Sequence, residues 1–237
     1  KEIETVYVAE KLTSSIGEAD GEKDDAYNNA YSIPINETPK VNGNESPATG
    51  TMYLLWDESY LYVFAEIVDK KVYDYSSDSD INKIDSFELM IDLYHESDYW
   101  LGGYGGEHRN EWYGNGAQMC EGLYRIAAGS NKAVVDSSII GSHYMWDAQK
   151  NNGSYYSKKT DIGYTVEFKI SVGADALTYL KANREIGVGV KLYDKYIDNA
   201  GLSVSSIEEI NYLQANSPRY LSNVILSQDN IEPTERN

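Results

Sequence analysis

The sequence is poor in cysteine, in basic residues and in long apolar runs. Its 237 residues include one cysteine, Cys120, so no internal disulfide is available to hold the fold. Lys and Arg number 20 against 38 Asp and Glu, which makes the formal net charge −18. Because binding phosphates requires clustered cations, this charge argues against nucleic acid and anionic membrane surfaces as partners. No segment approaches the roughly 20 consecutive apolar residues of a membrane span, so we expect none.

Familiar catalytic motifs are also missing. The sequence has no Gly-x-Ser-x-Gly nucleophile motif, no Gly-rich phosphate loop ending in Lys-Ser/Thr, no His-Glu-x-x-His and no Cys-x-x-Cys. The histidines are His95, His108 and His143, and their spacing is not that of metal ligands. Most hydrolase, kinase and zinc-enzyme functions are therefore disfavoured. A glycosidase needs only two carboxylates, so it stays open as an alternative.

The composition is unusually rich in tyrosine, with 22 Tyr against 3 Phe. Tyrosine combines an apolar ring with a polar tip, which suits strands and partly hydrated surfaces. The hydrophobic fraction of 41% is enough for one large globular core or two small ones. Together with the acidic residues, asparagine and glycine, this composition favours an extracellular protein, secreted or attached to a cell surface, that handles something neutral and polar.

Alternation of apolar and polar residues dominates the pattern. It predicts a hairpin of 52–56 and 61–68, and strands with one buried face at 87–91, 164–170 and 188–192. Weaker strand candidates are 2–10, 123–128, 133–140 and 223–226, and short helices are predicted at 24–31 and 174–182. We predict an all-β protein, an antiparallel β-sandwich of the jelly-roll or immunoglobulin-like kind, with one or two short helices. A single monomeric domain should span 1–227, and 228–237 should form a polar tail or linker stub.

The acidic residues cluster in two places, around Asp20 and around Asp69. Calcium binds six to eight oxygen ligands from carboxylates and backbone carbonyls in loops, which such clusters supply. The candidate ligands are Asp20, Glu22, Asp25 and Asp69. The alternative is a solvated acidic loop followed by a helix, since the helix dipole favours acidic residues in the first turn.

Several motifs in register resemble family 9 carbohydrate-binding modules. Residues 19–27, ADGEKDDAY, are similar to the opening signature of the family, Ile-Asp-Gly, two residues, Asp, two residues, Trp. Residues 54–63, LLWDESYLYV, resemble its Leu-Trp-Asp-Glu-x-x-Leu-Tyr-Val, and 85–92, DSFELMID, resemble Asp-Ser-Val-Glu-Ile-Phe-Ile-Asp. The segments GYTVEF at 163–168 and IGVGV at 186–190 follow in the expected order. The resemblance implies a sugar-binding β-sandwich of a kind often attached to xylanases, with related domains that carry structural calcium.

The resemblance also implies which side chains bind the sugar. Residues at the positions of Glu88, Arg125 and Lys191 hydrogen-bond the sugar in the family. The period of two places all three on the faces opposite their apolar neighbours, so they can share one exposed surface of the sheet. Gly187 and Gly189, on the same strand as Lys191, should leave room for a ligand to approach the backbone. The alternative is that the three are ordinary solvated residues that pair across strands.

The aromatic residues depart from the family pattern. The family clamps a terminal sugar between two Trp side chains. The first of these positions corresponds to Asn82 here, and the second falls at or near Tyr212. The candidates to replace the clamp are Trp100, Trp112 and Tyr113 in the Gly-rich segment 94–117, and Tyr73 or Tyr75. Sugar rings stack on such aromatic faces.

From the sequence we therefore predict a non-catalytic carbohydrate-binding module with a structural calcium ion. It should bind plant cell-wall oligo- or polysaccharide of the xylan or glucan type, chain ends included, and should direct an attached catalytic domain to it. Two alternatives remain. One is a calcium-stabilised structural or adhesive sandwich domain without a sugar site, and the other is a glycoside-active enzyme.

Overall fold

The structure is a computed structural model in which almost all regular structure is β-strand. It describes residues 4–14, 16–37, 48–76, 80, 83–93, 122–130, 153–171, 180–195, 203–205, 207, 221–229 and 231–236. The strands are β1 (Glu4–Lys11), β2 (Ser32–Ile35), β3 (Thr49–Trp56), β4 (Tyr60–Val68), β5 (Ser86–Asp92), β6 (Gly122–Ala127), β7 (Ser154–Lys159), β8 (Gly163–Ser171), β9 (Arg184–Asp194), β10 (Ser203–Ser205), β11 (Ser222–Ser227) and β12 (Thr234–Arg236). One 3₁₀-helix, η1 (Asp25–Asn29), lies in the predicted helical region 24–31.

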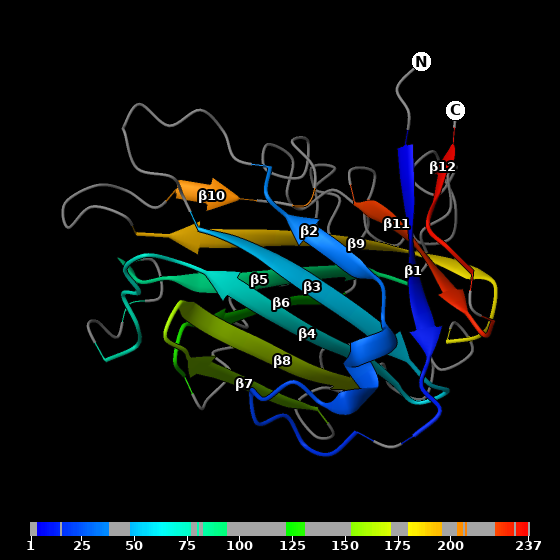
Figure 1. Cartoon of the computed structure of the whole chain (residues 1–237), viewed down its shortest axis with the longest axis horizontal. Coiled ribbons are helices and arrows are strands. Elements are labelled where there is room, and N and C mark those ends of the chain that lie inside the picture. The colour runs from blue at the N-terminus through cyan, green and yellow to red at the C-terminus, as the bar shows by residue number, and fades with distance from the viewer. Residues whose placement is uncertain are drawn as a thin grey trace, which may run out of the picture.

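The strands form one hydrogen-bonded path that folds into two layers. Its order is β6-β5-β9-β11-β1-β3-β4-β8-β7, and β10, β12 and β2 pair with β9, β1 and β3. Figure 1 shows β9, β5 and β6 in a layer behind β3, β4, β8 and β7. The expected β-sandwich is therefore confirmed.

The core lies between the layers and consists of the apolar side of each alternating strand. The ring centroids of Phe87 on β5 and Phe168 on β8 are 6.0 Å apart, and Tyr124 on β6 lies 6.0 Å from Phe168. The hairpin of β3 and β4 is paired in register from Thr49 opposite Val68 to Trp56 opposite Leu61. On these strands, the alternation of apolar and polar residues thus predicted the buried face correctly.

A second apolar cluster covers the outer side of β3 and β4. Tyr62 and Phe64, on the side of β4 opposite the core, pack against Ile16 and Tyr27 of the N-terminal segment. Glu167 on the outer side of β8 is 2% exposed, and its carboxylate accepts the backbone N–H groups of Asp20 and Gly21 at 2.8 and 3.0 Å. This buried carboxylate anchors the N-terminal segment to the sheet.

The structure differs from the sequence predictions in strand direction and in the tail. β1 pairs in parallel with both β11 and β3, so the sheet is mixed and the prediction of a purely antiparallel sandwich was wrong in this respect. The predicted tail contains β12, which pairs antiparallel with β1. Alternation does not encode strand direction, and a polar three-residue strand held by backbone hydrogen bonds leaves no apolar pattern.

Three further sequence predictions concern two helices and one strand. The helix expected at 24–31 is the shorter η1. The helix expected at 174–182 and the strand expected at 133–140 lie mostly or wholly outside the described residues. Within the described part of the chain, no helix is long and apolar enough to cross a membrane.

Candidate functional site

Glu88, Arg125 and Lys191 lie side by side on the outward face of β5, β6 and β9. Glu88 is directly opposite Arg125 on β6 and directly opposite Lys191 on β9. Residues opposite each other in antiparallel strands project to the same face, so the three side chains share one face as predicted. The prediction that this face is exposed was wrong for Glu88 and Arg125, which are buried. Their part in binding a ligand stays a prediction.

Tyr193 joins these residues into a network. Its hydroxyl donates to Glu88 Oε1 at 3.3 Å, and the Arg125 guanidinium carbon lies 3.9 Å from its ring centroid. Arg125 Nε also donates to Ser86 Oγ at 2.9 Å, which orients the guanidinium over the ring. Sequence reasoning missed Tyr193, although its position two residues after Lys191 on one strand places it on the same face.

The network is polar but shielded from water. Glu88 is 4% exposed and Arg125 is 6% exposed. Burial raises the pKa of the Glu88 carboxyl, while Lys191, Arg125 and the Tyr193 hydroxyl act in the opposite direction. Burial, followed by the charge of Glu88, raises the pKa of Tyr193, which therefore stays a neutral hydrogen-bond donor. Such oriented, poorly hydrated polar groups discriminate strongly between ligand hydroxyls that pair with them and groups that cannot.

Gly189 does not leave open space beside this network, and the prediction of open backbone there was wrong. A Cβ at Gly189 would lie 2.6 Å from Leu221 Cδ2 and 3.0 Å from Met90 Cε. Glycine is needed because Leu221 packs against the strand at this point. The predicted clamp positions Asn82 and Tyr212 lie outside the described residues, as do the candidate replacements Trp100, Trp112 and Tyr113.

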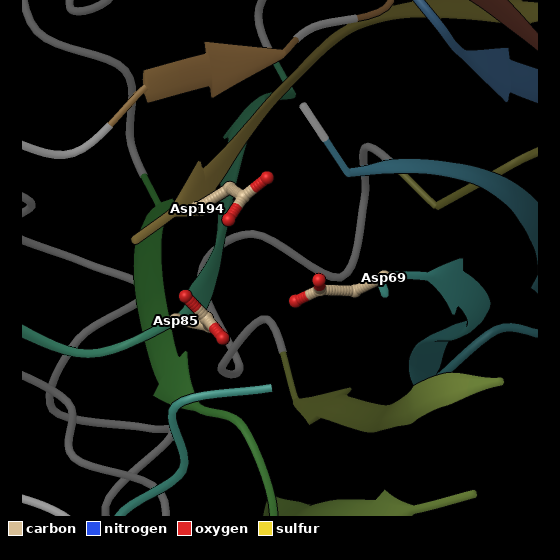
Figure 2. Close-up of side chains that lie close together, drawn as sticks. All are labelled: Asp69, Asp85 and Asp194. Carbon is tan, nitrogen blue, oxygen red and sulfur yellow. The ribbon is translucent and has the colours of Figure 1, made fainter. Parts of the chain in front are cut away.

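Three aspartates converge at one end of the space between the layers. Asp69 follows β4, Asp85 precedes β5 and Asp194 ends β9, and each offers a carboxylate oxygen within 4.8 Å of the others. Figure 2 shows the three carboxylates directed toward one another. Asp85 and Asp194 are buried, and Asp69 Oδ2 is buried without a hydrogen-bond donor. Carboxylates at this separation repel each other unless a proton or a cation lies between them.

Backbone groups hold these aspartates in place. Tyr73 N–H and Lys195 N–H donate to the two oxygens of Asp85 at 2.5 and 2.7 Å, and Lys71 N–H donates to Asp69 Oδ1 at 2.9 Å. Burial raises the pKa of Asp85 to about 8, although the hydrogen bonds from Lys195 N–H and Tyr73 N–H lower it. The charges of Asp69 and Asp194 add to the rise. The arrangement fits a divalent cation such as calcium, which binds carboxylate oxygens. Asp69 Oδ2 is available as a ligand, because it is buried and accepts no hydrogen bond.

The N-terminal acids do not join this cluster. Asp20 Oδ1 accepts the N–H of Glu22 at 2.8 Å, Glu22 pairs with Lys158, and Asp25 Oδ1 accepts from Asn28 at 3.3 Å. Among the described residues, the group of three or more acids close enough together to hold one metal ion consists of Asp69, Asp85 and Asp194. Of the predicted metal ligands, Asp69 therefore lies in an acidic cluster, whereas Asp20, Glu22 and Asp25 do not. Sequence reasoning could not find Asp194, which stands alone between Tyr193 and Lys195.

Comparison with known proteins shows both the family and the fold. The chain is 28% identical over 160 residues to endo-1,4-beta-xylanase A of Thermoanaerobacterium saccharolyticum, covering 60% of this chain but 13% of that protein. It is similar to a carbohydrate binding module family 9 from Caldicellulosiruptor kristjanssonii solved in complex with glucose, with a TM-score of 0.64, 18% identity and coverage of 95% and 98% of the two chains. The cellotriose complex of that module gives a TM-score of 0.61, 16% identity and 94% coverage of both chains. The family model described as carbohydrate family 9 binding domain-like matches residues 19–229, and this chain belongs to that family.

Proposed function

We propose that this domain binds oligo- or polysaccharide through the outward face of β5, β6 and β9. The observation that carries the proposal is the network of Glu88, Arg125, Lys191 and Tyr193 on that face. Its carboxylate, guanidinium, ammonium and hydroxyl groups can pair with adjacent sugar hydroxyls, and its aromatic ring offers an apolar surface. Membership of a carbohydrate-binding family supports the same function.

The proposed ligands are plant cell-wall glucans or xylans. The similar modules were solved with glucose and cellotriose, and the similar enzyme is named an endo-1,4-beta-xylanase. The chain spans 13% of the length of that xylanase. We propose that the domain is itself non-catalytic, acts outside the cell as a monomer and directs an attached catalytic domain to its polysaccharide. Reducing sugar released in proportion to the protein, and lost in a carboxylate variant, would instead establish a glycoside-active enzyme.

Calorimetric titration with glucose, cellotriose and xylotriose tests the proposal. Glu88→Gln and Arg125→Gln should each weaken binding by about 1–3 kcal/mol, because each leaves buried partners without their charged hydrogen bonds. Glu66→Gln is the matched control, since Glu66 is exposed on the other layer, beside Tyr53. Circular dichroism and thermal melts establish that each variant is folded. Full affinity in both site variants would exclude this face as the binding site.

We also propose that Asp69, Asp85 and Asp194 hold a calcium ion that stabilises the fold. The support is the geometry of the cluster and the buried Asp69 Oδ2, which has no donor. The ion would supply positive charge that offsets the repulsion of three carboxylates and would tie the ends of β4 and β9 to the start of β5. This cluster also favours the second candidate function, a calcium-stabilised structural or adhesive domain. Stabilisation by calcium without binding of any tested sugar would support that alternative.

A further inference from the structure

A cleft lies on the outer side of the front layer, the layer of β3, β4, β8 and β7 in Figure 1. Its volume is about 630 Å³, within the range of about 300–1,000 Å³ that ligand pockets occupy. Figure 1 shows η1 beside the ends of β1 and β3, where the cleft is found. Leu55 lines the cleft and belongs to the apolar cluster on the outer side of β3 and β4. The cleft and the network of Glu88 and Arg125 therefore lie on opposite faces of the sandwich.

Segments far apart in the sequence form the polar lining of the cleft. They supply Glu10 from β1, Asn29 from η1, Tyr31, and Gln228, which follows β11. Glu10 is paired with Leu55 on β3 and with Ser227 on β11. It therefore lies between the two strands that bring Leu55 and Gln228 to the cleft.

Glu10 is the lining residue whose surroundings most favour a ligand. Its side chain is half-buried, and burial raises the pKa of its carboxyl. Within the described part of the chain, no hydrogen bond or nearby cation offsets this effect. A partly shielded carboxylate without a donor from the protein is a strong acceptor for the hydroxyl hydrogens of a bound molecule.

The lining combines hydrogen-bonding groups with apolar side chains. The amides of Asn29 and Gln228 and the hydroxyl of Tyr31 can each donate and accept hydrogen bonds. The apolar side chains are those of Leu12, Ala26 and Leu55, all part of the cluster that covers β3 and β4. A sugar has the same two kinds of surface, because its hydroxyls lie at the ring edge and its C–H groups form apolar ring faces.

The acids of the cleft are not arranged around a single metal ion. Glu10, Asp25 and Asp229 line it, but their carboxylates do not all lie within 4.8 Å of one another. Asp25 Oδ1 also accepts a hydrogen bond from Asn28 at 3.3 Å. Separated carboxylates and amides around a cleft of this volume suit a larger ligand with several hydroxyl groups.

We propose that this cleft is a second carbohydrate-binding site, which takes one or two sugar units of neutral charge. Glu10 accepts hydrogen bonds from sugar hydroxyls, the amides of Asn29 and Gln228 pair with neighbouring hydroxyls, and a ring face lies against the apolar side chains. The inference goes beyond the proposed function, because this site is separate from the face of β5, β6 and β9. Two sites on opposite faces let one domain hold two polysaccharide chains and strengthen its retention on an insoluble polysaccharide.

NMR titration of the ¹⁵N-labelled domain with cellobiose and with xylobiose tests the proposal. At least one disaccharide should shift the side-chain amide signals of Asn29 and Gln228, which report on the cleft. The backbone amides of Lys191 and Tyr193 report on the other face, and the two groups of signals should give separate Kd values. Glu88→Gln should weaken binding at Lys191 and Tyr193 and leave the Kd measured at the cleft unchanged.

Two variants of the cleft locate the second site. Glu10→Gln should weaken binding there about tenfold, because it removes a charged acceptor without changing the shape of the side chain. Asn29→Ala, at an exposed position, should weaken it about threefold when it is measured at Gln228. Glu66→Gln is the matched control, since Glu66 is exposed on the same layer beside Tyr53, and it should change neither Kd.

The possible outcomes separate this site from the proposed function. Shifts confined to Lys191 and Tyr193, or cleft shifts that both cleft variants leave intact, would overturn the second site while the proposed function stands. Cleft amides that respond to added calcium and to neither disaccharide would also overturn it. Shifts confined to the cleft would support the second site and refute the proposed face of β5, β6 and β9. Absence of binding at either place would refute both.

Discussion

Asp69→Asn should nearly abolish the effect of calcium removal on the stability of this fold. Asp69 uses Oδ1 to accept the Lys71 N–H at 2.9 Å, whereas Oδ2 is buried without a donor. Asparagine keeps the first oxygen and replaces the second by an amide that carries no charge and can donate to the neighbouring carboxylates. With calcium present the variant loses a ligand, and without calcium it loses one of three mutually repelling charges. The variant should therefore be less stable than the wild type in calcium and more stable in chelator.

The size of the effect follows from the binding equilibrium. An ion that binds only the folded state stabilises it by about 2.7 kcal/mol at a hundredfold excess over Kd. For a domain of 150 to 250 residues, 1 kcal/mol corresponds to roughly 2–4 °C in Tm. Chelation should thus lower the Tm of the wild type by roughly 5–10 °C, whereas the Tm of Asp69→Asn should change by no more than about 2 °C.

The dependence on pH has a defined sign. Burial and the neighbouring aspartates raise the pKa of Asp85 from 3.8 to about 8 when no ion is bound. An acid whose pKa is raised in the folded state holds its proton longer there, so the calcium-free protein should lose stability as the pH rises from about 4 to about 8. The ion binds the deprotonated carboxylates, so chelator should destabilise the protein more at pH 8 than at pH 5.

Thermal melts followed by circular dichroism, in 1 mM calcium and in chelator at both pH values, measure these effects. Asp161→Asn is the matched control, since Asp161 is exposed in the turn before β8 and should respond to chelator like the wild type. Sodium at the same ionic strength should not restore the Tm. If sodium restores it, or if Asp69→Asn responds to chelator as the wild type does, the cluster does not hold a calcium ion.

Three further substitutions test the packing that positions these sites. Glu167→Ala should cost about 1–3 kcal/mol, because it removes the acceptor of two buried backbone N–H groups, and hydrogen exchange should accelerate selectively at Asp20 and Gly21. Gly163→Ala should destabilise by at least about 2 kcal/mol in urea unfolding, since its Cβ would lie 2.0 Å from Ile67 O, whereas Gly17→Ala, with nothing within 4 Å, should be nearly neutral. Phe168→Ala should cost about 3–5 kcal/mol because this ring joins the two layers, and a cost below 1 kcal/mol would contradict that role.

The alternating pattern predicted much of the sheet. It predicted β3, β4, β5, β8 and β9, and it placed Glu88, Arg125 and Lys191 on one face of the sheet. Tyr193 could have been included by the same rule. These features depend on period two along a single strand, which is a local property of the residue order.

Burial of the polar residues depended on packing that the local pattern does not contain. Alternation placed Glu167 on the outer side of β8, which is correct, but it did not predict that the N-terminal segment would cover it. The same holds for Gly189, whose side of β9 is occupied by Leu221 from a distant part of the chain.

The sequence by itself determined which residues form strands and which side of each strand faces the core, because side chains alternate whatever the rest of the chain does. Only the tertiary structure decided that β1 runs parallel to its two neighbours and that Asp69, Asp85 and Asp194 meet. Asp69 and Asp85 lie at the ends of the consecutive strands β4 and β5, whereas Asp194 ends β9, much further along the chain. Their proximity results from the pairing order of the strands, which depends on long-range contacts rather than on local sequence.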